Sequence, residues 1–137
     1  MVIIPPYATP SPENAGHLPL VENAALAALL ASLDHDEHAV DGFVETFIDH
    51  WPKRLRRAEE SVAAQDTAAI YDCALSIKVS GQMVGALRLS TLGSELESLV
   101  RSGRLDDAVP LLDELRAVGD ETIRALAEAR RRHYHAA

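Results

Sequence analysis

The chain has few of the residues that would define a disulfide-rich, membrane-spanning or β-rich protein. It contains one cysteine, Cys73, which excludes an internal disulfide framework and is typical of a reducing cytoplasm, where we expect the protein to be located. Only 4% of the residues are aromatic, so Leu, Ala and Val must fill the core, which favours helices over a β-sandwich. No apolar run approaches membrane-spanning length, and we expect no membrane partner.

Basic residues are missing from the first 50 positions, which contain eight acids and neither Lys nor Arg. The formal net charge of the whole chain is −8. Nucleic acid binding needs a concentrated positive field, so we expect no nucleic-acid partner. The one basic cluster, Lys53-Arg54-Leu55-Arg56-Arg57, is followed directly by Glu59 and Glu60. We interpret this cluster as a solvent-exposed helix face.

The 137 residues allow one domain with a core of its own. Residues 1–20 contain five of the seven prolines and are predicted to form an extended or partly disordered leader. From residue 21, apolar residues recur at three- and four-residue steps between short polar breaks, which predicts amphipathic helices. We therefore predict an all-α, antiparallel up-and-down four-helix bundle over 21–132, with a short extra N-terminal helix and a tail at 133–137.

Two helices are predicted in the first half of the bundle. The first is short and ends in the polar stretch 34–37, where Asp34 or Asp36 can cap the next helix. The second helix keeps its apolar phase across Pro52, which predicts one long kinked helix rather than two separate helices.

Three more helices are predicted in the second half. Asp66 is a candidate N-cap for the third helix, and Gly85 is expected in the turn that follows it. The buried stripe of the third helix is predicted to consist of Ile70, Cys73, Ala74 and Ile77. A fourth helix is expected from about residue 86 to 103. A fifth is expected from about residue 105, with a stripe of Ala108, Leu112, Leu115, Ile123 and Leu126.

The reactive residue types do not combine into an enzyme site. His35 and His38 lie in an exposed acidic segment that lacks the four well-placed ligands of a structural zinc site. His50 is interpreted as a partly exposed surface histidine, and Cys73 as a small core residue. Neither a Gly-x-Ser-x-Gly motif nor a Gly-rich phosphate loop is present. We expect no enzyme activity, no cofactor and no metal.

Several motifs occur in an informative order between about Leu20 and Arg132. They are the proline-containing segment 43–55, the small-residue-and-Asp turn at 63–66, Ala74-Leu75-Ser76-Ile77-Lys78-Val79-Ser80-Gly81, Gly85-Ala86, Leu96-Glu97 and Ser102-Gly103-Arg104-Leu105. In this order and spacing they resemble the histidine-containing phosphotransfer (HPt) domain family. The resemblance implies a helical bundle that takes a phosphoryl group from a receiver aspartate onto an exposed histidine and passes it on.

The chain departs from the family pattern where that chemistry takes place. Leu75 stands at the position that matches the phospho-accepting histidine, and Val79 stands where the family has a small glycine one turn later. Lys78 remains as the cation that would offset phosphoryl charge. Ser76 cannot substitute, because it points about 100° around the helix from Leu75. A register that uses His50 instead would place Pro52 within the motif and lose the downstream matches. The resemblance therefore implies a domain without phosphotransfer.

The residues that line this side of the third helix are predicted to bind a protein partner. They are Tyr71, Leu75, Lys78, Val79 and Gln82, which follow helical spacing beside the core stripe. We expect Leu75 and Val79 to lie largely on the surface. The predicted function is a non-catalytic HPt-like adaptor that binds a receiver domain or a histidine kinase, as a monomer or weak homodimer. The alternatives are a decayed surface, coverage of the stripe by the leader or a second copy, or a structural or oligomerising helical module outside signalling.

Overall fold

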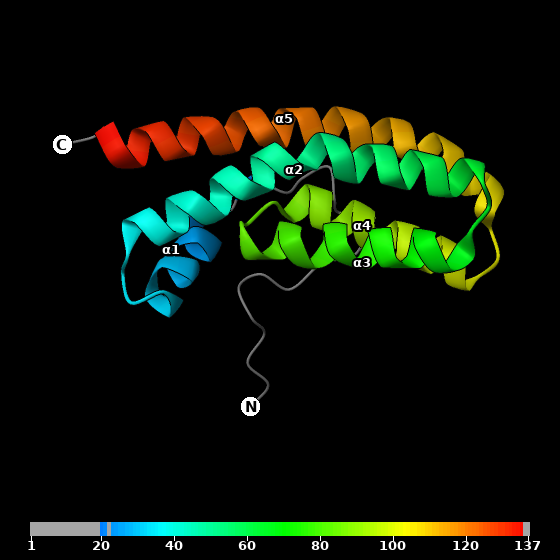
Figure 1. Cartoon of the computed structure of the whole chain (residues 1–137), viewed down its shortest axis with the longest axis horizontal. Helices are drawn as coiled ribbons and strands as arrows, with labels where there is room; N and C mark the ends of the chain where they lie inside the picture. The colour runs from blue at the N-terminus through cyan, green and yellow to red at the C-terminus, as the bar shows by residue number, and fades with distance from the viewer. Residues whose placement is uncertain (1–19, 22, 136–137) are drawn as a thin grey trace.

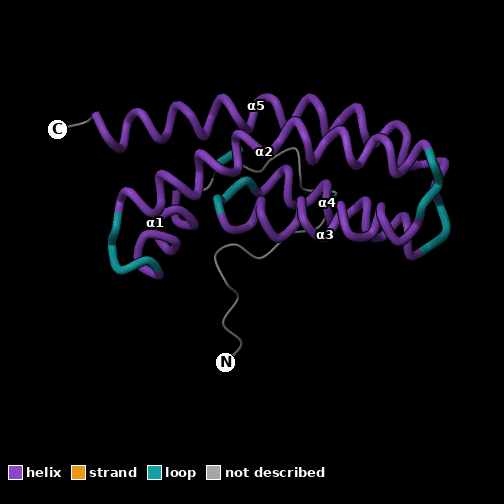
Figure 2. The backbone as a smooth tube through the Cα atoms, in the orientation of Figure 1, coloured by secondary structure: helices purple, strands orange, loops and turns teal. Residues whose placement is uncertain are grey.

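The computed structural model describes residues 20–21 and 23–135, and within these it consists of helices and turns (Figures 1 and 2). The elements are α1 (Asn23–Ser32), α2 (Glu37–Ala63), α3 (Thr67–Met83), α4 (Leu87–Arg101), a 3-10 helix η2 (Leu105–Asp107) and α5 (Ala108–His135). The all-α prediction is confirmed. The predicted leader at 1–20 lies almost entirely outside the described residues.

Two aspartates begin the helices that they were predicted to cap. The Asp36 carboxylate accepts a hydrogen bond from the Ala39 N–H at 3.2 Å, and the Asp66 carboxylate accepts one from the Ala69 N–H at 3.1 Å. Each bond satisfies a backbone donor that has no partner within the first helical turn. The α2 helix continues through Pro52, which confirms one long helix in place of two.

The four long helices lie alongside one another, and the chain reverses direction at each connection between them (Figure 1). The α3 helix packs against both α2 and α4, and α5 packs against both α2 and α4, while the short α1 contacts α2 and α3. Gly85 occupies the α3–α4 turn as predicted, with a φ of 76° that a residue with a side chain rarely adopts. No helix in the described part of the chain is both long and apolar enough to cross a bilayer.

The core follows the apolar phase read from the sequence, with two differences in α5. The predicted stripe of α3 is confirmed, since its four residues are between 0% and 6% exposed. In α5, Leu111 is buried, at 5%, whereas Leu112 and Ile123, both predicted to be buried, are only partly buried. Leu111 and Leu112 both fit three- and four-residue steps between the buried Ala108 and Leu115, so the spacing alone does not choose between them.

A close contact between α3 and α4 fixes the orientation of the predicted binding face. A Cβ atom placed on Gly93 of α4 would lie 2.8 Å from the Lys78 backbone nitrogen and 3.1 Å from the Ala74 carbonyl oxygen. The Ser90 hydroxyl donates a hydrogen bond to the Lys78 carbonyl at 3.0 Å. The backbones of the two helices therefore come into close contact between Ala74 and Lys78.

Candidate functional site

The five predicted binding residues all lie on α3. Two of them, Tyr71 and Lys78, contact side chains of α4. Val79 is 50% exposed, as expected. Leu75 is half-buried, which is less exposed than we expected. Long side chains on a helix lean toward the preceding turn, which reduces the exposure of a leucine even on an open face. Tyr71, Lys78 and Gln82 are also half-buried.

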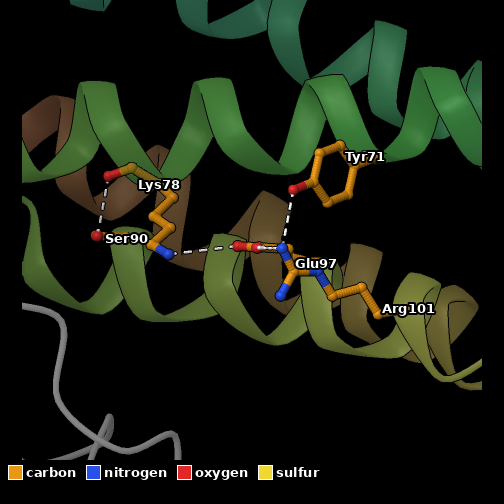
Figure 3. A network of polar contacts seen from close by, with 5 residues as sticks. All are labelled: Tyr71, Lys78, Ser90, Glu97 and Arg101. Atoms are coloured by element: carbon orange, nitrogen blue, oxygen red, sulfur yellow. Dashed lines mark hydrogen bonds and ion pairs between the residues drawn. The ribbon is translucent and has the colours of Figure 1, made fainter.

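A chain of polar contacts links Tyr71 and Lys78 of α3 to α4 (Figure 3). Lys78 Nζ lies 3.3 Å from Glu97 Oε2, and Arg101 lies 3.3 Å from Glu97 Oε1. Arg101 also donates a hydrogen bond to the Tyr71 hydroxyl at 3.0 Å, and its guanidinium lies 5.5 Å from the centre of the Tyr71 ring. Two of the five predicted binding residues are thus held in place by a carboxylate and a guanidinium from the neighbouring helix.

The electrostatic centre of this network is Glu97, whose side chain is only 11% exposed. A buried carboxylate needs compensating charge, which Lys78 and Arg101 provide together. The hydrogen bond to Tyr71, followed by electrostatic interaction with Tyr71 and the carboxylate of Glu97, raises the pKa of the Arg101 guanidinium. Lys78 is therefore part of an ion pair, and it is not available as an isolated cation.

Sequence reasoning missed the roles of Glu97 and Arg101. One local signal was present, because the two residues are four apart on α4 and such pairs meet on a helix surface. The contacts to Lys78 and Tyr71 join residues 19 and 30 positions apart. Spacing along the chain does not predict contacts of that kind.

Neither α3 nor α4 contains a histidine. His50 lies exposed on α2, and His35 and His38 lie exposed at the turn before α2 and in its first turn. Within residues 20–21 and 23–135, no group of three or more His, Cys, Asp or Glu side chains is arranged to hold a metal ion. The face of α3 around Leu75 thus offers apolar surface, a tyrosine and an ion pair, without an imidazole.

The family model for the Hpt domain matches residues 42–131, from α2 into α5. The chain belongs to the Hpt domain family. Hpt domains are phosphotransfer modules of phosphorelays, and they interact with receiver domains and histidine kinases. The match covers the whole of α3 and α4, so the site described above lies inside the Hpt domain.

Two solved structures are similar to this Hpt domain. Histidine-containing phosphotransfer protein B (HptB) from Pseudomonas aeruginosa PAO1 is 25% identical, with a TM-score of 0.75, over 83% of this chain and 96% of that one. The HPT domain of an Hpt sensor hybrid histidine kinase from Shewanella is 15% identical, with a TM-score of 0.63, over 76% and 90%. The second likeness shows the fold alone. Comparison with curated proteins finds no match.

Proposed function

We propose that this Hpt domain is a non-catalytic adaptor, which binds a receiver domain or a histidine kinase in the cytoplasm without transferring phosphate and without enzyme activity. The observation that carries the proposal is the absence of histidine from α3, where Leu75 stands at the position that resemblance assigns to the phospho-acceptor. The pairwise packing of α2, α3, α4 and α5 supports an antiparallel up-and-down four-helix bundle as the scaffold.

Three features of the α3 face argue against phosphotransfer. Leu75 has no lone pair with which to attack a phosphoryl group. Val79 is 50% exposed and one turn further along, so its branched side chain occupies the space beside the acceptor position. Lys78, which would offset the phosphoryl charge, is paired with Glu97 at 3.3 Å. A variant that removes only one of these three obstacles to phosphotransfer would keep the other two.

The same face retains the properties of a docking surface. Leu75 and Val79 lie one turn apart, and each aliphatic side chain that a partner buries fully contributes about 1.5–3 kcal/mol. Tyr71 and Lys78 beside them are fixed by Arg101 and Glu97, so a partner meets side chains that are already ordered. We propose that the chain presents this surface as a monomer or weak homodimer.

We predict that the wild-type chain gains no acid-labile label when it is incubated with radiolabelled phosphoramidate as the phosphoryl donor. The variant Leu75→His/Val79→Gly should gain such a label, because it restores the imidazole and clears the space beside it. Leu75→His alone should gain less. Label is measured on the denatured chain before and after acid treatment. Acid-labile label on the wild-type chain that disappears in His50→Ala would contradict the proposal and identify His50 as the acceptor.

A further inference from the structure

The basic residues of one segment of α2 lack the carboxylate partners that several other cations of the described chain have. Lys78, Arg101, Arg104, Arg116 and Arg130 each have a carboxylate oxygen within 4.0 Å. The basic segment at 53–57 has no such ion pair within the described residues, although the chain contains 21 acids and 13 bases. Four cations of α2 are therefore without a direct carboxylate partner, and the Arg54 guanidinium instead lies 5.8 Å from the centre of the Phe47 ring.

Two of these cations share a pocket between α2 and α3. The pocket has a volume of about 290 Å³ and is lined by Arg54 and Arg57 from α2 and by Ala69, Asp72, Cys73 and Ser76 from α3. Arg54 and Arg57 are three residues apart, so both guanidiniums project from the same side of the helix. Ser76 adds a hydroxyl donor from the opposite wall. The pocket thus combines two planar sets of N–H donors with one O–H donor.

The charges around the pocket favour an anion. Burial, and then the charge of Arg57, lowers the pKa of the Arg54 guanidinium, as expected for two like charges that line one pocket. Burial raises the pKa of the Cys73 thiol, so this thiol adds no negative charge to the pocket at neutral pH. Asp72 contributes one negative charge and leaves a net positive charge among the lining residues.

We propose that this pocket is a binding site for a dianionic phosphate group, held by Arg54, Arg57 and Ser76. Two guanidinium groups and a hydroxyl offer more hydrogen-bond donors than the two oxygens of a carboxylate can accept. They match a phosphate group, which has three terminal acceptor oxygens. A dianion is also attracted twice as strongly as a monoanion by the same net charge. The site lies on the α2 side of α3, and it requires neither a docked partner nor phosphotransfer at Leu75.

The test is an NMR titration of the full chain, which follows the arginine Nε–Hε signals at constant ionic strength. Inorganic phosphate should shift the Arg54 and Arg57 signals saturably and leave Arg116, which is paired with Glu59, unmoved. Acetate should bind more weakly. A phosphoserine peptide that binds more tightly than inorganic phosphate would identify a phosphorylated side chain as the source of the group, and the reverse order would identify the free anion. Either order supports the site.

Neighbouring variants separate a built pocket from general charge attraction. Arg57→Gln should weaken phosphate binding about tenfold, because it removes a charge-assisted hydrogen bond. Arg56→Gln changes the net charge equally but does not line the pocket, so its effect should be about twofold or less. Asp72→Asn should strengthen binding. Equal losses in Arg56→Gln and Arg57→Gln, shifts that do not saturate, or equal affinity for acetate and phosphate would overturn the proposal.

Discussion

Gly119→Ala is expected to lower the free energy of unfolding by about 2–3 kcal/mol. A Cβ atom at position 119 would overlap the indole of Trp51 and lie 2.6 Å from its Nε1 atom. Trp51 is 2% exposed, so the ring can move only by displacing other core side chains. Alanine would otherwise favour the helix by about 1 kcal/mol, and the clash must exceed that gain.

Gly42→Ala is the matched control for this experiment. Gly42 is exposed and helical, and no atom lies within 4 Å of a Cβ placed there. Its replacement should raise the free energy of unfolding by about 0.5–1 kcal/mol. The free energy of unfolding of both variants is measured by urea titration. Far-UV circular dichroism is the probe, because Gly119→Ala perturbs Trp51 and therefore its fluorescence. Effects of the same sign would contradict the packing of α5 against α2 described here.

Leu75→Asp is expected to abolish binding of a receiver domain or histidine kinase while the monomer stays folded. A charge placed in a buried contact and left unpaired costs several kcal/mol, so the affinity should fall by at least about a hundredfold. In the free chain Leu75 is only half-buried, and the aspartate can reach water. The free energy of unfolding should therefore fall by roughly 1 kcal/mol or less. Affinity is measured by calorimetry and stability by urea unfolding.

Val109→Asp serves as the control for the docking surface. Val109 is 58% exposed at the start of α5, outside the α3 stripe, so the same kind of change should leave the affinity unchanged. If Leu75→Asp unfolds the chain, the residue belongs to the core. If Leu75→Asp retains full affinity, the partner docks on another surface.

The parts of the fold that could be predicted from the sequence depend on local chemistry. Asp36 and Asp66 bond to amides three residues ahead, and such caps are visible in a short stretch of sequence. The buried face of α3 was predicted correctly because apolar residues repeat with the helical period. The position of Leu75 within the Hpt domain was inferred from the order of neighbouring motifs.

The parts that could not be predicted depend on contacts between helices. The residues around Gly119 in the sequence do not indicate that a side chain there would clash. The need for glycine follows from the Trp51 ring of α2, which lies against this position in α5. The ion pair between Lys78 and Glu97 crosses from α3 to α4, so the sequence predicted Lys78 as a binding residue without its carboxylate partner. The pocket beside Arg54 depends on the spacing of α2 and α3. The basic segment was therefore interpreted only as a solvent-exposed face.

The measurement that tests the adaptor function most directly follows binding and phosphoryl transfer in the same sample. A receiver domain carrying a radiolabelled phosphoryl group is mixed with the chain, the complex is isolated by size exclusion, and the two proteins are then separated under denaturing conditions. The adaptor function predicts a complex that forms with the wild-type chain and is lost with Leu75→Asp, while all label stays on the receiver or is hydrolysed. Acid-labile label on the wild-type chain would show a working phosphotransfer domain. The absence of any complex with receivers or kinases would instead indicate a helical module outside signalling.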